Sequence, residues 1–184
     1  AAAATKPFGF NAFYPGPGLG GHCIPIDPFY LTWKAKEYGV DTKFIQLAGK
    51  INSDMPKWVI KKVNSALKII NVKPKDSKIL ILGLAYKKNI DDFRESPAVE
   101  ILKLIKRKVK KIDYSDPYIP EFKLSDKNKI ILKSRKLKKG LISSYDLILL
   151  CTDHDEFPYK LIRENAKVIV DTRNVYRNSY KNVI

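Results

Sequence analysis

The sequence is short of cysteine, of acidic residues and of long hydrophobic runs, and each shortage excludes a class of protein. Two cysteines in 184 residues cannot build a disulfide scaffold, so we expect a reducing, cytoplasmic compartment. The apolar run at residues 79–85 is interrupted by Gly83, and no run approaches the roughly 18 residues of a membrane helix. The first ten residues lack the basic start and apolar centre of a secretion signal.

Acidic residues are outnumbered, since 35 lysines and arginines face 19 aspartates and glutamates, a net charge of +16. Fourteen of the basic residues lie between residues 101 and 150, against five acidic ones. This balance favours anionic partners. Few aromatic residues alternate with these lysines, so a solvated surface is the simpler explanation. A basic α/β module that binds nucleic acid or polyanions through residues 101–139 is the alternative function that we weigh below.

A glycine- and proline-rich loop, residues 6–28, opens the chain. The next segment has helical periodicity, and we expect Asp27 to be its N-cap and Pro28 to lie in its first turn. Gly39 is expected to end this helix. Apolar residues then recur three or four apart over residues 44–70, which predicts one long amphipathic helix or two helices separated near Pro56.

After residue 74 the pattern changes to that of an α/β domain. Apolar runs typical of buried parallel strands alternate with helical segments; the expected strands cover residues 78–84, 112–114, 145–151 and 167–171. This alternation predicts a Rossmann-like, doubly wound parallel sheet over residues 75–184, preceded by a helical segment over residues 1–74. Ligands of such sheets bind at the carboxyl ends of the strands, which here carry residues 86–88, 116–117, 152–154 and 171–173.

Cys23 is the strongest candidate for a catalytic residue. It lies behind two glycines and just ahead of the predicted helix start, where a helix N-terminus stabilises a thiolate; the alternative is an incidental small hydrophobic residue. Asp27 could serve as a cap, or could orient water or take a proton near the thiol. Cys151 ends an apolar strand and is expected to be buried. The cysteines and histidines lack paired-ligand spacing, so we predict no metal site.

The glycines at residues 16–21 resemble a dinucleotide fingerprint, but no predicted strand precedes them and prolines surround them. We therefore do not expect this loop to be a dinucleotide site. Glycines there permit close approach to a bulky ligand, with main-chain N–H groups free for phosphate or hydroxyl oxygens. Lys87 and Arg94 follow the first strand and Arg173 follows the last; these positions suit phosphate binding, although a solvated loop explains Lys87 and Arg94 equally well.

Taken together, four stretches resemble the UDP-glucose/GDP-mannose dehydrogenase family. They are GPGLGGHCIPID (16–27), GLAYKKNIDDFRESPA (83–98), CTDHDEF (151–157) and VDTR (170–173). Ile26 stands where UDP-glucose dehydrogenases usually carry lysine, which favours the branch that acts on UDP-N-acetylhexosamines such as UDP-GlcNAc or UDP-ManNAc.

The resemblance implies an NAD-dependent, two-step oxidation of the C6 alcohol of a UDP-sugar to the uronic acid. Cys23 would form a thiohemiacetal and then a thioester, and Asp27 would help water to release the product. The residues expected to bind substrate are Phe13, Tyr14, Gly20, Lys87 and Arg173, and Arg94 is expected to reach NAD.

The family's NAD-binding domain has no counterpart here. We therefore expect this chain to be the carboxyl-terminal part of the enzyme and to be inactive alone. The resemblance also implies a homodimer formed through the helices at residues 28–70, without nucleic-acid or membrane partners.

Overall fold

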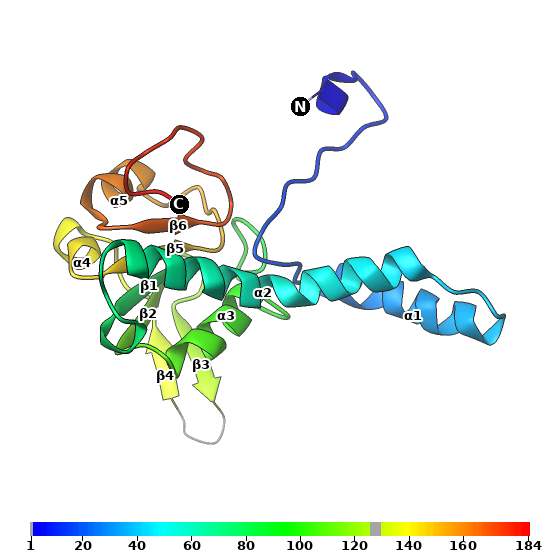
Figure 1. The fold of residues 1–184 in the computed structure, drawn as a ribbon, viewed down its shortest axis with the longest axis horizontal. Coiled ribbons are helices and arrows are strands. Elements are labelled where there is room, and N and C mark those ends of the chain that lie inside the picture. Colours follow the sequence, from blue (N-terminus) through cyan, green and yellow to red (C-terminus); the bar gives the residue numbers. More distant parts are fainter. Residues whose placement is uncertain (1, 126–129) are drawn as a thin grey trace.

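A computed structural model describes residues 2–125 and 130–184 (Figure 1). Residues 126–129, part of the basic region considered above, lie outside the described residues. In chain order the helices and strands are α1 (Cys23–Glu37), α2 (Lys43–Ile69), β1 (Lys78–Leu82), α3 (Pro97–Lys106), β2 (Lys111–Ser115), β3 (Glu121–Ser125), β4 (Ile130–Lys133), α4 (Lys139–Ser143), β5 (Leu147–Leu150), α5 (Tyr159–Asn165) and β6 (Ile169–Asp171). Short 3-10 turns cover Ala2–Thr5 and Pro74–Asp76.

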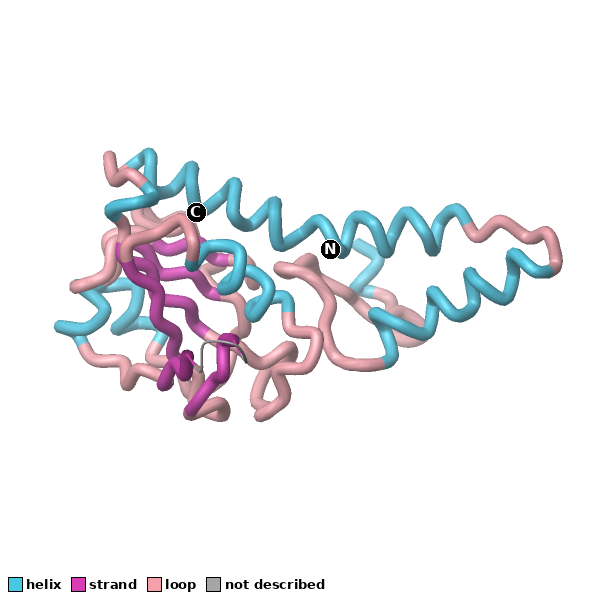
Figure 2. The backbone as a smooth tube through the Cα atoms, turned by 90° about the horizontal axis from the view of Figure 1, so that it is seen from below, coloured by secondary structure: helices cyan, strands magenta, loops and turns pink. Residues whose placement is uncertain are grey.

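The core is a four-stranded parallel sheet in the order β2-β1-β5-β6. Alternate side chains of β1 enter two different cores: Ile79 and Ile81 join the cluster under α2 and α3, and Leu80 and Leu82 join the cluster under α4 and α5. A strand buried on both faces needs apolar residues at every position, which explains the continuous runs in the sequence. The predicted doubly wound parallel sheet is confirmed (Figures 1 and 2).

The strand order creates a topological switch point between β1 and β5. From β1 the chain passes through α3 to the outer strand β2, and then returns past β1 to β5 and β6. The direction of winding therefore reverses between β1 and β5. Ligands of open α/β sheets bind at such a switch point, beyond the carboxyl ends of the two strands.

An antiparallel hairpin, β3 and β4, and the short helix α4 were not predicted from the sequence. Strand β3 alternates polar and apolar residues, and β4 has only four residues, so neither has the longer apolar run that marks the central strands. Phe122 nevertheless packs into the main core with 4% of its surface exposed. Leu124 and Leu132 are partly buried against the same core, so the hairpin is held by Phe122 together with these two side chains.

Helix α1 begins at Cys23, five residues earlier than predicted, with His22 at the N-cap position and no side-chain cap. The predictions that Asp27 caps this helix and that Pro28 lies in its first turn are therefore wrong. Pro25 lies in the first turn, where backbone N–H groups need no helical partner. Pro28 lies inside the helix, and its carbonyl accepts a hydrogen bond of 3.0 Å from the Thr32 hydroxyl. Gly39 follows the helix end with φ of +72°, as expected.

Helix α2 is one continuous helix of 27 residues with Pro56 inside it, so of the two expected arrangements the single helix is correct. Its carboxyl-terminal half packs on the sheet through Val59, Val63 and Leu67, which are at most 2% exposed. The helix therefore joins the amino-terminal segment to the α/β domain, and the division near residue 74 stays a prediction. Among the described residues, no helix is both long and apolar enough to cross a bilayer.

Candidate functional site

The glycine loop packs tightly against the loop that follows β1. A Cβ atom added at Gly20 would lie 2.5 Å from the Tyr86 Cβ atom, and one added at Gly21 would lie 2.9 Å from the Tyr86 ring. The N–H of Gly21 donates to the Arg94 carbonyl (3.2 Å), and the N–H of Leu19 donates to the Asn52 side chain (2.7 Å). The glycines thus allow the loop to pack closely against Tyr86 of the same chain. The N–H groups of Gly21 and Leu19, which we expected to be free for a ligand, already form hydrogen bonds within the protein.

Cys23 is the first residue of α1, and Asp27 lies one turn further along the helix. Residues four apart lie on the same helix face, with Cβ atoms about 5–6 Å apart. Both side chains are exposed, and the Cys23 thiol is free. The structure therefore brings the two candidate catalytic residues together, although Asp27 is not the cap. Cys151 is buried as predicted, and burial raises the pKa of its thiol to about 12.

Lys87 lies in the loop after β1, next to the Tyr86 that contacts the glycine loop. Its side chain is exposed and forms no hydrogen bond or ion pair with the residues that the structure describes. The following residues are fixed to the loop after β5. Lys88 pairs with Asp155 at 2.5 Å, and Asn89 donates to the same carboxylate at 2.6 Å. The hydrogen bond from Lys88 lowers the pKa of Asp155, with a further contribution from Asn89.

Arg173 follows β6, and its guanidinium is held in place. Its Nε donates to Asp153 at 2.9 Å, and its main-chain N–H donates to Asp171 at 2.9 Å. A Cβ atom added at Gly16 would lie 2.6 Å from an Arg173 guanidinium nitrogen, so this side chain rests directly against the glycine loop. Segments from both ends of the chain therefore meet at the carboxyl edge of the sheet, as the strand ends predict.

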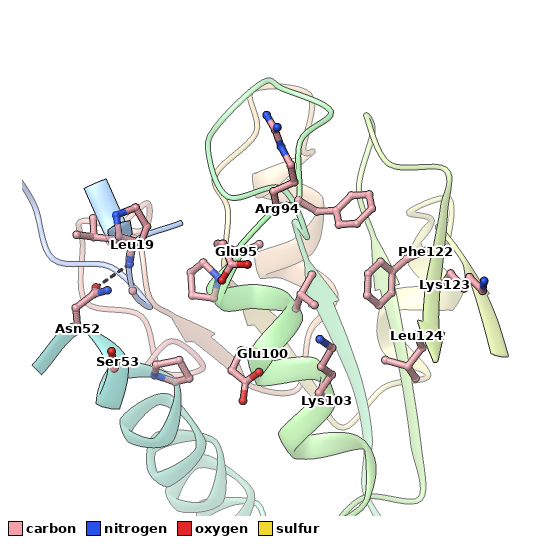
Figure 3. A pocket seen from close by; sticks show the side chains of 17 residues that line it. Leu19, Asn52, Ser53, Arg94, Glu95, Glu100, Lys103, Phe122, Lys123 and Leu124 are labelled. Atoms are coloured by element: carbon pink, nitrogen blue, oxygen red, sulfur yellow. Dashed lines mark hydrogen bonds between the residues drawn. The ribbon is translucent and has the colours of Figure 1, made fainter. Parts of the chain in front are cut away.

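Arg94 borders a cavity of about 600 Å³ between α2, α3 and β3. Figure 3 shows Leu19 and Asn52 on one side of the cavity and Phe122 and Leu124 on the other. Arg94 pairs with Asp92 at 2.6 Å, and this hydrogen bond lowers the pKa of the Asp92 carboxyl. Among the predicted site residues, it alone lines this cavity.

Phe13 and Tyr14 are not brought to the site. They lie on the extended amino-terminal segment that projects from the rest of the molecule (Figure 1) and are 86% and 79% exposed. Their predicted contact with substrate, like that of Gly20, stays a prediction.

Asp116 and His154 form a buried, hydrogen-bonded pair at the strand ends, and the sequence reasoning gave neither residue a role in the site. Asp116 follows β2 and is 3% exposed. Its carboxylate accepts the main-chain N–H groups of Leu84, Ala85, Tyr118 and Ile119 at 2.7–3.1 Å. His154 is fully buried and lies 3.1 Å from the same carboxylate. Burial opposes ionisation of Asp116, but these hydrogen bonds outweigh it and lower its pKa. Their position directly after buried strands was the available signal.

The acidic and thiol groups of this region do not form a metal centre. Among the residues with described placements, no three His, Cys, Asp or Glu side chains gather closely enough to hold a metal ion.

Comparison with known proteins matches two parts of the chain to one family. Residues 80–178, more than half of the sequence, match the UDP binding domain of the UDP-glucose/GDP-mannose dehydrogenase family, and residues 1–54 match its central domain. A UDP-N-acetyl-D-mannosamine dehydrogenase from Pyrococcus horikoshii is 36% identical over 168 residues, covering 89% of this chain and 37% of that protein. An NDP-N-acetyl-D-galactosaminuronic acid dehydrogenase from Ralstonia solanacearum is 31% identical over 90% of this chain and 37% of its own length.

A solved structure of the UDP-D-ManNAc dehydrogenase from Pyrococcus horikoshii is similar over the whole chain, with a TM-score of 0.80 and 31% identity. The match covers 41% of that structure, so this chain spans about two fifths of the relatives' length. The folded sheet, the glycine loop against Tyr86 and the family match over most of the sequence agree. The chain belongs to the UDP-glucose/GDP-mannose dehydrogenase family.

Proposed function

We propose that this chain is the substrate-binding and thiol-bearing part of an NAD-dependent dehydrogenase that oxidises C6 of a UDP-N-acetylhexosamine to the uronic acid. The observation that carries the proposal is the meeting of three segments: the glycine loop ahead of Cys23, the Tyr86 and Lys87 loop, and Arg173. The relatives named for UDP-N-acetyl-D-mannosamine support this substrate class.

In this reaction Lys87 and Arg173 bind the two phosphates of the substrate. Lys87 is an exposed cation without a partner among the described residues. Arg173 is oriented by Asp153, so its guanidinium is already placed when the anion arrives. Charge-assisted bonds of this kind are the strong ones in nucleotide recognition. Gly20, Phe13 and Tyr14 complete the pocket in our proposal, with the projecting segment folding over the bound sugar.

Cys23 supplies the covalent step. NAD⁺, when bound, would supply the oxidant for both two-electron oxidations, the first of which would convert the C6 alcohol to an aldehyde. The thiolate of Cys23 adds to the carbon of this aldehyde and forms a thiohemiacetal, which the second oxidation would convert to a thioester. Asp27, on the same helix face, takes a proton from the water that attacks the thioester. The carboxylate product leaves, and the Cys23 thiol is regenerated.

The described residues supply only part of an NAD site. The glycine loop at residues 16–21 follows no strand among the described residues, so it is not the dinucleotide fingerprint. Arg94, at the rim of the 600 Å³ cavity, is the one residue that we assign to NAD. We therefore propose that residues 1–184 alone do not turn over substrate.

We further propose that two copies of the chain associate through α1 and the adjoining half of α2, in the cytoplasm. Apolar side chains there are exposed, among them Trp33 (62%) and Phe44 (89%). Covering such side chains is favourable, and a reducing compartment would keep the Cys23 thiol available.

Calorimetric titration of the chain with UDP, UDP-GlcNAc, NAD⁺ and a short oligonucleotide at physiological salt tests the proposal. We expect UDP and the UDP-sugar to bind, and Lys87→Ala to weaken binding roughly tenfold or more. Lys108→Ala is the matched control, since Lys108 is also exposed and lies beyond the end of α3. Oligonucleotide binding with no response to UDP would instead support the basic binding module.

Activity is tested by following NADH formation with UDP-N-acetylhexosamines. We expect no more NADH from residues 1–184 than from their Cys23→Ala variant. NADH formation that depends on Cys23 would show that the chain needs no further domain.

A further inference from the structure

A fully buried histidine connects the three loops that follow β1, β2 and β5. His154 has no exposed surface and Asp116 is 3% exposed, so both side chains depend on protein partners. The Asp116 carboxylate also holds the start of the β1 loop through the N–H groups of Leu84 and Ala85. The network of Asp116 and His154 lies at the switch point of the sheet. It is bonded to the loop that carries Lys87.

The hydrogen bonds of His154 define its protonation state. Its Nδ1 lies 2.9 Å from the main-chain nitrogen of Asn89, an N–H that can only donate. Nδ1 must therefore be the acceptor, and the ring proton is on Nε2, which donates to Asp116 at 3.1 Å. A neutral imidazole satisfies both partners, whereas a doubly protonated ring would turn a second N–H toward that of Asn89.

The bond to Asn89 bears on the geometry of the β1 loop. Asn89 has φ of +59°, a left-handed conformation that needs support in a residue other than glycine. Its N–H is held by His154, and its side chain by Asp155. On the other side of Lys87, Ala85 is held by Asp116 and by the Thr152 hydroxyl. Hydrogen bonds therefore fix the backbone on both sides of Lys87, at Ala85 and at Asn89. The Lys87 side chain itself stays available to bind a ligand.

We propose that His154 is a positioning residue for nucleotide binding: its neutral ring, oriented by Asp116, holds the Asn89 N–H and so presents Lys87 to the phosphates of the substrate. This inference rests on the proposed function for its ligand. The positioning itself is a property of the chain without ligand.

Two substitutions separate positioning from stability, because each keeps one of the two hydrogen bonds. His154→Asn can place its amide oxygen where Nδ1 lies and accept the Asn89 N–H, but it leaves Asp116 without its side-chain donor. His154→Gln can reach Asp116 with its amide N–H, but it leaves the Asn89 N–H without a partner. If His154 served stability alone, the variant that is less stable would also be the weaker binder.

The experiment measures the urea midpoint, hydrogen exchange at the Asn89 amide and the UDP dissociation constant of both variants and of the unmodified chain. We expect His154→Asn to be less stable than His154→Gln, yet to bind UDP within about threefold of the unmodified chain. His154→Gln should bind about tenfold more weakly and lose protection at the Asn89 amide. In the Lys87→Ala background, His154→Gln should weaken binding much less, because coupled residues are not additive.

Nitrogen chemical shifts of the imidazoles report the tautomer directly. The chain has two histidines, so His22→Gln assigns the remaining signals to His154. We expect a proton on Nε2 and none on Nδ1. A proton on Nδ1, or affinities that follow the order of stability, would overturn the proposal.

Absence of UDP binding by the unmodified chain would contradict the proposed function. The exchange of the Asn89 amide and the tautomer would still decide whether His154 holds this loop, so the two failures are distinguishable.

Discussion

The molecule has two regions that differ in how far their large apolar side chains are buried. In the body, residues 59–125 and 130–184, most of the large apolar residues are buried; Ile81, Leu82 and Leu149 are at most 1% exposed. The arm, α1 together with residues 43–58 of α2, exposes Trp33, Phe44 and other residues of similar size. The body packs against itself on both faces of a sheet. The arm is a pair of helices, and the residues that the structure describes leave many of its large apolar side chains exposed.

The two halves of α2 allow a direct comparison of the two regions, because each half carries a leucine and the two leucines differ in exposure. Leu67 is fully buried under the sheet and Leu47 is 53% exposed. We expect Leu67→Ala to lower the free energy of unfolding by about 3 kcal/mol and Leu47→Ala by about 0.5 kcal/mol or less. Urea denaturation of the two variants measures the difference. Equal losses would mean that the arm is packed in solution, and that the comparison is mistaken.

Asp116→Asn tests whether the body depends on its buried carboxylate. The amide replaces one of two acceptor oxygens, so we expect a loss of about 2–3 kcal/mol at neutral pH. Because the pKa of Asp116 is lowered in the folded chain, its contribution is complete above the ordinary aspartate value near 4. It is lost as the pH falls through the lower, folded value.

Urea titrations of Asp116→Asn at several pH values should therefore show the gap to the unmodified chain closing in acid. Asp76→Asn is the control, since Asp76 is exposed in a 3-10 turn. A gap that stays constant from neutral to strongly acidic pH would contradict the role of the carboxylate charge.

Alanine substitutions at Gly21 and Gly39 compare the junction of the two regions with the far end of the arm. Both have positive φ, +85° and +72°, so alanine is strained at either position by about 1 kcal/mol. Only Gly21 faces a neighbour, since a Cβ atom there would meet the Tyr86 ring at 2.9 Å while Gly39 has open space.

We therefore expect Gly21→Ala to be the more destabilising by about 1 kcal/mol and to weaken UDP binding, whereas Gly39→Ala leaves binding unchanged. Thermal unfolding and calorimetry provide the two measurements. Weakened binding in both variants would mean that the arm itself contacts the nucleotide.

Trp33→Lys tests the arm as a dimer surface and should affect the monomer least. Because Trp33 is 62% exposed, we expect its replacement to change monomer stability by about 0.5 kcal/mol or less. Sedimentation equilibrium at tens of micromolar should show dimers of the unmodified chain and mostly monomers of the variant. A clean monomer before substitution would count against the proposed homodimer.

Local patterns were sufficient for the central strands and for the glycine loop ahead of Cys23. Apolar runs predicted β1 and β5, and the helical periodicity of residues 44–70 predicted α2. The glycines around Cys23 marked the loop that contacts Tyr86. These features were predictable because each depends on residues close together in the sequence.

The start of α1 was not predictable in this way. Asp27 and Pro28 are good N-terminal residues for a helix, yet the helix begins at Cys23. The Gly21 N–H bonds to Arg94 and fixes the chain direction just ahead of Cys23, so a residue 73 positions away decides where the loop ends. The local preferences of Asp27 and Pro28 therefore placed the start of α1 too late in the sequence.

The sequence by itself determined the parallel sheet, the family and the candidate thiol, because periodicity and motifs are properties of neighbouring residues. The tertiary structure alone decided that Asp116 and His154 share one buried network, that Asp153 orients Arg173, and that the apolar face of the arm is left open. The partners in that network are 38 residues apart for His154 and Asp116 and 65 for Asn89 and His154. Contacts over such distances depend on how the strands are ordered in the sheet, and no local pattern carries that information.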